Sequence, residues 1–165
     1  MHRRYLLPRD EALVADFFKL TAIRETQVED ARQVVCSSSF FSPQAVFSFL
    51  DRYGVGRLSP HDLQSFLQSH YVSCTLAEAS SIIEEYDENG DGRLSFREFE
   101  RFCLSSESDQ LQWKAKSRHY ADSMSRSGGL DYYVERDFLQ LLRAELIYQR
   151  DTSSSIPSKS FHNNY

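Results

Sequence analysis

The stretch Asp87-Glu88-Asn89-Gly90-Asp91-Gly92-Arg93-Leu94-Ser95-Phe96-Arg97-Glu98 decides the fold of this chain of 165 residues. Oxygen-bearing side chains stand at its first, third and fifth positions, a glycine at the sixth and a glutamate at the twelfth. This spacing fits the pattern D-x-[DN]-x-[DN]-G-x5-E at every fixed position. Apolar residues recur at helical spacing on both sides, so the sequence predicts a helix, a twelve-residue loop and a second helix.

The oxygen donors of this loop, which we call the second loop (residues 87–98), suit calcium. Calcium takes six to eight hard oxygen ligands, and the glycine at the sixth position permits the sharp turn that brings them together. Glu98 is long enough to give both of its oxygens. We expect one calcium ion per chain. Its predicted ligands are the side chains of Asp87, Asn89, Asp91, Ser95 (directly or through a water) and Glu98, and the backbone carbonyl of Arg93.

The second loop has a partner earlier in the chain, the first loop (residues 51–62), which starts 36 residues before it, because Asp51 corresponds to Asp87. The partner lacks ligands: Tyr53 and Val55 occupy its third and fifth positions, and Asp62 at the twelfth is one methylene short. We therefore predict that the first loop is a metal-free structural partner. One such unit cannot bury its apolar face alone, so the two should share a core.

The segment from residue 43 to 104 resembles the EF-hand superfamily of calmodulin-like calcium-binding proteins, on its loop, its apolar helix positions and its repeat. The resemblance implies an all-α fold, calcium binding and protein–protein recognition. It also implies that the backbones of Leu58 and Leu94 pair in a short antiparallel bridge that couples the two loops.

The rest of the chain is predicted to be helical around this pair. Residues 1–42 contain a long helix over about 10–35 and a linker. Its apolar stripe is Leu13, Phe17, Leu20, Val28, Ala31 and Val35, with a gap at Arg24. Residues 105–150 form a helical hairpin, with a first helix over 107–120. The hairpin is either a decayed third repeat, offset by a residue or more, or a plain hairpin. Residues 151–165 form a flexible tail.

Composition narrows the function. The net charge of -5 does not favour nucleic acid as a partner. No apolar run approaches the ~20 residues that span a bilayer, so no membrane insertion is expected. Three scattered cysteines, Cys36, Cys74 and Cys103, suggest reduced thiols in an intracellular, cytoplasmic protein. No nucleophile, phosphate loop or catalytic carboxylate pair stands out, so an enzyme is not expected.

Two functions remain open. The first is a subunit of a larger assembly that holds a constitutive protein partner; the repeat is similar in style to EF-hand proteins of cytoskeletal and ciliary structures. The alternative is a calcium sensor that regulates a target by exposing an apolar groove. The scarcity of methionine favours one fixed partner. The sequence supplies seven aromatic candidates for an exposed contact surface, and we expect some of them to be exposed because not all can face inward; the alternative is that the flanking helices cover all of them. The candidates are Phe17, Phe18, Phe40, Phe41, Phe47, Phe49 and Phe66.

Overall fold

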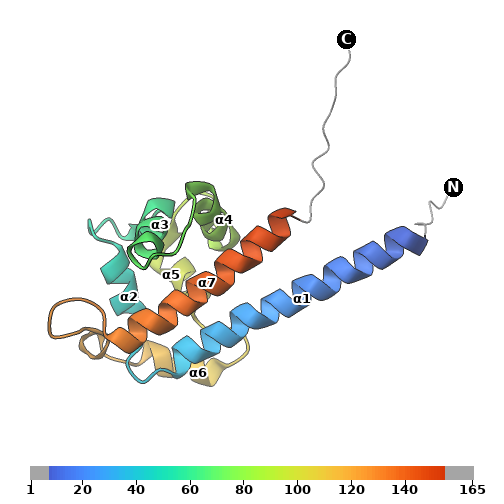
Figure 1. Cartoon of the computed structure of the whole chain (residues 1–165). Coiled ribbons are helices and arrows are strands. Elements are labelled where there is room, and N and C mark those ends of the chain that lie inside the picture. The colour runs from blue at the N-terminus through green and yellow to red at the C-terminus, as the bar shows by residue number, and fades with distance from the viewer. Residues whose placement is uncertain (1–7, 155–165) are drawn as a thin grey trace, which may run out of the picture.

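The computed structural model describes residues 8–154, and its architecture is all-α, as predicted (Figure 1). Within this range two short strands form the one small sheet. The elements are α1 (Pro8–Ser37), α2 (Pro43–Leu50), β1 (Arg57–Leu58), α3 (Pro60–Ser69), α4 (Leu76–Tyr86), β2 (Leu94–Ser95), α5 (Phe96–Cys103), α6 (Asp109–Lys116), the 3-10 turn η1 (Tyr120–Ser123) and α7 (Tyr132–Ser154).

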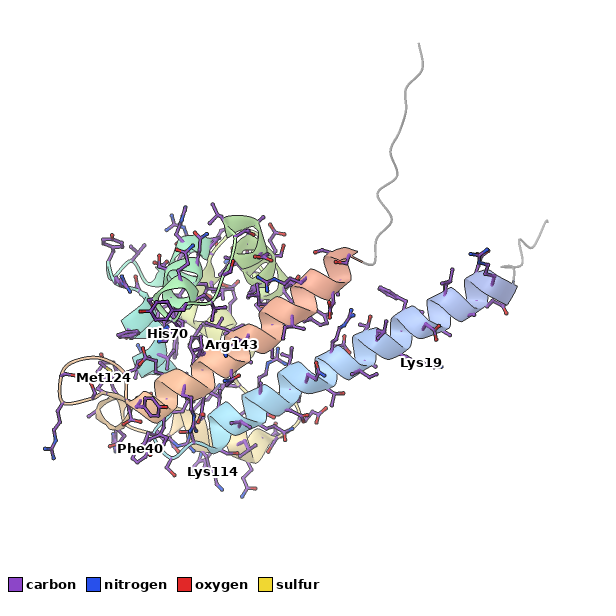
Figure 2. All side chains as sticks on the ribbon, in the orientation of Figure 1. Lys19, Phe40, His70, Lys114, Met124 and Arg143 are labelled. Atoms are coloured by element: carbon purple, nitrogen blue, oxygen red, sulfur yellow. The ribbon has the colours of Figure 1, made fainter. Side chains whose placement is uncertain are left out.

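Helices α1 and α7 run side by side in opposite directions, and helices α2 to α5 pack on one side of this pair (Figure 1). The predicted apolar stripe agrees with this packing, because its members Val28 and Val35 are buried in the half of α1 that packs against the other helices. The N-terminal half of α1 extends past the end of α7 (Figure 2, where Lys19 marks it). There the same stripe is uncovered: Leu13 is 61% exposed and Phe17 42% exposed.

Two helix–loop–helix units occupy residues 43–103, as the repeat predicts. Helix α2 begins after Ser42 with Pro43 at its first position, a favourable helix start. Thr75 and Ser95 cap α4 and α5 with reciprocal bonds to the glutamates three residues on. Strands β1 and β2 pair antiparallel with Leu58 opposite Leu94, which confirms the predicted bridge between the loops.

The core lies between these two units and helix α7. The ring of Phe138 on α7 is fully buried, and its centroid lies 5.6 Å from that of Phe66 on α3. It lies 5.9 Å from the ring of Phe99 and 6.1 Å from that of Phe102, both on α5. Helix α7 therefore fills the apolar groove that the two units would otherwise present to solvent.

The hairpin after α5 keeps the register of the repeat, and the offset that we expected is wrong. Gly56, Gly92 and Gly128 are spaced by 36 residues, and all three have positive φ, of 78°, 75° and 87°. The buried Leu130 follows Gly128 as Leu94 follows Gly92. These features favour a decayed repeat over a plain hairpin.

The corresponding third loop (residues 123–134) has no carboxylate at the ligand positions of the pattern. It has serine at its first, third and fifth positions and Val134 at its twelfth. Its isolated bridge joins Met124 to Leu130 within the loop itself, so in the part of the chain that the structure describes this loop does not pair with the other two.

Several boundaries differ from the prediction. Helix α6 ends at Lys116 rather than near Tyr120, because the chain turns into η1. Helix α7 continues to Ser154, so residues 151–154 of the predicted tail are helical; the rest of that tail and residues 1–7 lie outside the described range. No helix in the described range is long and apolar enough to cross a membrane.

The predicted aromatic contact residues separate into two groups. Phe17, Phe18 and Phe40 are exposed. Phe41, Phe47 and Phe66 are buried, and Phe49 packs against the core. The expectation that some of the candidates are exposed is confirmed, and the alternative that all of them are covered is wrong. Phe66 is buried because α7 covers it. All three cysteines are buried free thiols.

Candidate metal site

The second loop connects α4, which ends at Tyr86, to α5, which begins at Phe96. Gly90 and Gly92 both adopt positive φ, of 73° and 75°, which lets the chain turn tightly around the carboxylate of Asp87. The Oδ1 atom of Asp87 accepts a hydrogen bond from the Gly90 N–H at 2.9 Å, and its Oδ2 atom accepts one from the Gly92 N–H at 2.7 Å. The loop is thus wrapped around its first predicted ligand.

The next two predicted ligands are also fixed by backbone N–H groups of the loop. The Oδ1 atom of Asn89 accepts from the Asp91 N–H at 3.0 Å, and the Oδ1 atom of Asp91 accepts from the Arg93 N–H at 3.0 Å. Each of these side chains closes a turn two residues long, which is a local preference of Asn and Asp. These two hydrogen bonds are therefore made within the loop itself.

Glu98 is buried, with only 4% of its surface exposed. Its Oε1 atom accepts from the Glu88 N–H at 3.0 Å, and its Oε2 atom accepts from the Ser95 N–H at 2.7 Å. The second of these bonds belongs to the capping box of α5. Glu98 lies in the first turn of α5, and its carboxylate bonds to Glu88 near the start of the loop and to Ser95 near its end. It therefore links the two ends of the second loop.

The chemistry of this donor set fits calcium: three carboxylates, one amide oxygen and a hydroxyl, all hard oxygens, come from one loop. Asp87, Asn89, Asp91, Ser95 and Glu98 and the carbonyl of Arg93 would hold the ion. Among the residues described, no three His, Cys, Asp or Glu side chains converge into a tight metal cluster. The carboxylates instead bond to backbone N–H groups, which calcium would replace in part.

The first loop is closed by its own hydrogen bonds. Both oxygens of Asp51 accept from loop N–H groups, those of Val55 at 2.9 Å and Gly56 at 2.6 Å. Asp62 accepts from the Ser59 N–H at 2.7 Å and caps α3. Tyr53 points into solvent, 88% exposed. The carboxylates of Asp51 and Asp62 thus serve the turn and the helix cap, and the first loop has too few further oxygens to bind a calcium ion.

One contact between the loops was missed by the sequence reasoning. The guanidinium of Arg57, in the first loop, forms an ion pair with the Oδ2 atom of Asp91, a predicted ligand in the second loop. The two residues are 34 positions apart, and only the pairing of β1 with β2 brings them together. No local sequence signal could have found this pair.

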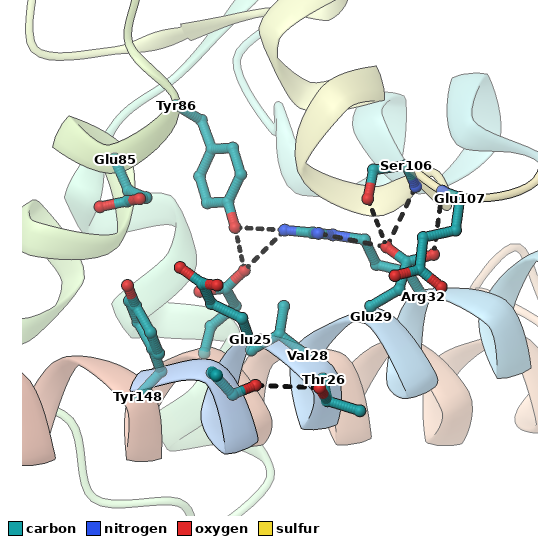
Figure 3. Close-up of a pocket in the computed structure, with 12 residues that line it drawn as sticks. Glu25, Thr26, Val28, Glu29, Arg32, Glu85, Tyr86, Ser106, Glu107 and Tyr148 are labelled. Atoms are coloured by element: carbon teal, nitrogen blue, oxygen red, sulfur yellow. Dashed lines mark hydrogen bonds and ion pairs between the residues drawn. The ribbon is translucent and has the colours of Figure 1, made fainter. Parts of the chain in front are cut away.

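A second missed feature lies at the entrance to the loop. Tyr86, the residue before Asp87, donates its hydroxyl to Glu145 of α7 and accepts from Arg32 of α1. Figure 3 shows this cluster at a cavity of about 470 Å³ between α1, α4 and α7. Burial raises the pKa of Glu145 to about 7, although Tyr86 and Arg32 act in the opposite direction.

Glu29 of α1 holds the segment that leaves α5. Its carboxylate accepts from the Ser106 N–H at 3.0 Å and from the hydroxyls of Ser105 and Ser106. Burial alone would raise the pKa of Glu29, but these hydrogen bonds outweigh it and lower the pKa to about 2. The Nε of Arg32 donates to the Phe102 carbonyl at 2.9 Å. Glu29 and Arg32 therefore connect α1 to the end of the second helix–loop–helix unit.

Comparison with known proteins identifies the segment that contains the two loops. A family model for an EF-hand domain pair matches residues 44–104. Polcalcin Cup a 4 of Hesperocyparis arizonica is 36% identical over 64 residues, which is 39% of this chain and 39% of that protein. Calcium-binding protein CML38 of Arabidopsis thaliana is 30% identical over 73 residues, 44% of this chain and 41% of that protein.

The calcium-dependent protein kinase 13 of Arabidopsis thaliana is 30% identical over 91 residues, which is 55% of this chain but 16% of the kinase. The chain thus spans less than half the length of each of these three relatives. The likeness to the kinase covers a small part of it, so its name carries no catalytic activity over to this chain. No solved structure is significantly similar to this chain.

Proposed function

Because residues 44–104 are an EF-hand pair of the calmodulin-like kind, we propose that this chain binds one calcium ion in its second loop and serves, without catalysis, as a standing protein-interaction module. The observation that carries the proposal is the position of α7. Its Phe138 already occupies the groove between Phe66, Phe99 and Phe102, where a sensor would take up its target.

Calcium has a structural role in this proposal. The ion would gather the amide oxygen of Asn89 and the carboxylates of Asp87, Asp91 and Glu98, whose negative charges otherwise repel one another within a single loop. Binding to the folded state alone stabilises that state by mass action. The ion would therefore strengthen the second unit and its contacts with α7, while the groove stays filled.

The partner surface in this proposal is the free N-terminal half of α1. Phe18 is 64% exposed there, and Leu13, Phe17 and Leu20 continue the stripe that α7 covers farther along the helix. A free helical segment as short as this half of α1, with one uncovered apolar stripe, is only marginally stable in water by itself. We propose that the occupant is an amphipathic helix of a partner protein that takes the place of α7 along this part of α1.

The setting that we propose for this module is a larger intracellular assembly of the cytoskeletal or ciliary kind. The support for this setting is that the repeat, with one intact and one degenerate loop flanked by extra helices, is similar in pattern to EF-hand proteins of such structures. A fixed subunit needs a surface that is permanently exposed, and the stripe of α1 is such a surface because it lies away from the calcium loop.

The alternative, a calcium sensor, is favoured by one observation, the link from Tyr86 to Glu145 and Arg32. Tyr86 directly precedes the ligand Asp87, so a shift of the loop would act on α1 and α7 together. In a sensor, calcium would release α7 from the groove and expose the rings that α7 now covers.

Calcium titration calorimetry tests the site. We expect a stoichiometry of one and a Kd within ~10⁻⁷–10⁻⁴ M. Glu98→Gln should abolish tight binding, while circular dichroism should show that the helices persist, because glutamine also serves a capping box. Asp62→Asn, the same change at the twelfth position of the first loop, is the matched control and should bind as the wild type does. A stoichiometry of two, or weaker binding by Asp62→Asn, would contradict the assignment.

An apolar dye such as ANS separates the two functions. The standing module predicts dye fluorescence that is equal in calcium and in EGTA and that falls in Phe18→Ser, because the dye reports the stripe of α1. A sensor predicts fluorescence that rises with calcium. Light scattering of the isolated chain then tests what covers the exposed stripe of α1. A monomer agrees with the proposed helix of a partner protein. A dimer would show instead that the stripe binds a second copy of this chain.

A further inference from the structure

We propose that Arg57 of the first loop is a built-in competitor of calcium for Asp91, and that it thereby sets the calcium affinity of the second loop. The inference rests on the proposed calcium site and adds a residue that lies outside the binding loop. The first loop, which has lost its own ligands, then has a regulatory role in the site next to it.

The contact that carries the proposal is the ion pair between the Arg57 guanidinium and the Oδ2 atom of Asp91. The other oxygen of Asp91, Oδ1, is held by the Arg93 N–H at 3.0 Å. Arg57 therefore takes the oxygen that the loop backbone leaves free. Asp91 is the ligand at the fifth position of the loop, so a cation already sits on a carboxylate that calcium requires.

The position of Arg57 follows from the pairing of the loops. Strand β1 places Arg57 opposite Ser95, and the neighbouring pair of Leu58 with Leu94 is buried. The buried leucines fix the two backbones against each other. The Arg57 side chain is half-exposed and lies over the second loop, where Asp91 meets it.

The first loop has no need of this arginine. The carboxylate of Asp51 is satisfied by the N–H groups of Val55 and Gly56, and Asp62 is satisfied by its cap on Ser59. The guanidinium is thus available to the neighbouring loop.

Binding of calcium must displace this cation, and the displaced guanidinium then remains close to a divalent ion. A half-exposed ion pair makes a modest contribution, and the repulsion between Arg57 and the bound ion adds to it. Removal of the charge is therefore expected to tighten calcium binding by about three- to tenfold.

The experiment is calcium titration calorimetry of the full chain with Arg57→Gln. We expect the Kd to fall by about three- to tenfold, with the stoichiometry still one. Arg52→Gln is the matched control, because Arg52 lies in the same loop, is exposed and carries the same charge. Its Kd should stay within about twofold of the wild type, since it removes charge without removing the pair.

A Kd that is unchanged or higher in Arg57→Gln, or an equal fall in both variants, would overturn the role of Arg57. Arg57→Lys keeps the charge and should bind near the wild-type affinity, and circular dichroism of each variant checks the fold. Absence of binding by the wild-type chain would refute the calcium site itself. The two failures are therefore distinguishable.

Discussion

Truncation of Phe138 tests whether α7 is an integral part of the EF-hand pair. Full burial of a phenylalanine side chain contributes about 1.5–3 kcal/mol, and Phe→Ala changes in cores cost about 3–5 kcal/mol once the cavity is included. The ring of Phe138 is fully buried and meets three other aromatic rings from two helices. Rigid rings on several sides cannot collapse into the space, so we expect Phe138→Ala to lower the free energy of unfolding by about 4–5 kcal/mol.

Urea denaturation followed by circular dichroism in EGTA measures this loss. Ile147→Ala is the matched control, because Ile147 lies on the same helix and is 51% exposed; it should change the free energy of unfolding by at most about 0.5 kcal/mol. If Phe138→Ala does not fold, Phe138→Leu should retain the fold with a loss of about 1.5 kcal/mol. A Phe138→Ala loss no larger than that of Ile147→Ala would refute the packing of α7 into the groove.

Two further predictions concern buried carboxylates. Glu145 has a folded pKa of about 7 against 4.5 unfolded, so the folded state holds its proton more tightly, and its contribution is full below pH 4.5 and is lost as the pH rises toward 7. Relative to Glu145→Gln, the wild type should lose about 2–3 kcal/mol of unfolding free energy between pH 5 and pH 8; parallel curves would contradict this. Glu29 has the opposite sign: its folded pKa of about 2 means that its contribution is lost as the pH falls below 4.5. Glu29→Gln should cost about 1–3 kcal/mol at pH 7 and less at pH 3, as unfolding at the two pH values will show.

The second loop could be predicted from the sequence because its chemistry is local. The turns at Asn89 and Asp91, the positive φ of Gly92 and the cap at Ser95 each depend on residues within five positions of one another. The all-α fold and the bridge of the two loops follow from the same pattern. Where the interactions are short-range, residue type and spacing are sufficient.

The features that were not predicted depend on distant segments. The sequence did not tell which candidate aromatic residues are buried: Phe66 is buried because α7, some 70 residues later, covers it, and its ring lies against that of Phe138. The pair of Arg57 with Asp91 needs the two loops to dock. The register of Gly128 and Leu130 was visible in the sequence, but the absence of carboxylates at the first, third, fifth and twelfth positions of that loop obscured it.

The third unit contributes a helix to the core of the first two units. Phe66, Phe102 and Phe138 are equivalent residues of successive units, 36 positions apart, and the ring of Phe138 contacts both others. The exiting helix of the third unit thus completes the core of the first two, where a second unpaired groove would otherwise remain open. Helix α7 thus lies in the groove of the pair as part of the same chain.

This attachment limits what calcium can do. A ligand present at 100 times its Kd stabilises the state that it binds by about 2.7 kcal/mol, and it can drive a conformational change only by the difference in its affinity for two states. The contact of Phe138 alone is expected to contribute about 4–5 kcal/mol to holding α7 in the groove. If these magnitudes hold, calcium by itself would fall short of expelling α7, in agreement with the proposed standing module, and release would require a partner that replaces the aromatic contacts of the helix. With α7 retained, the proposed binding at Asp87 to Glu98 would reinforce the second unit, and the exposed stripe of α1 would be the surface open to the proposed partner.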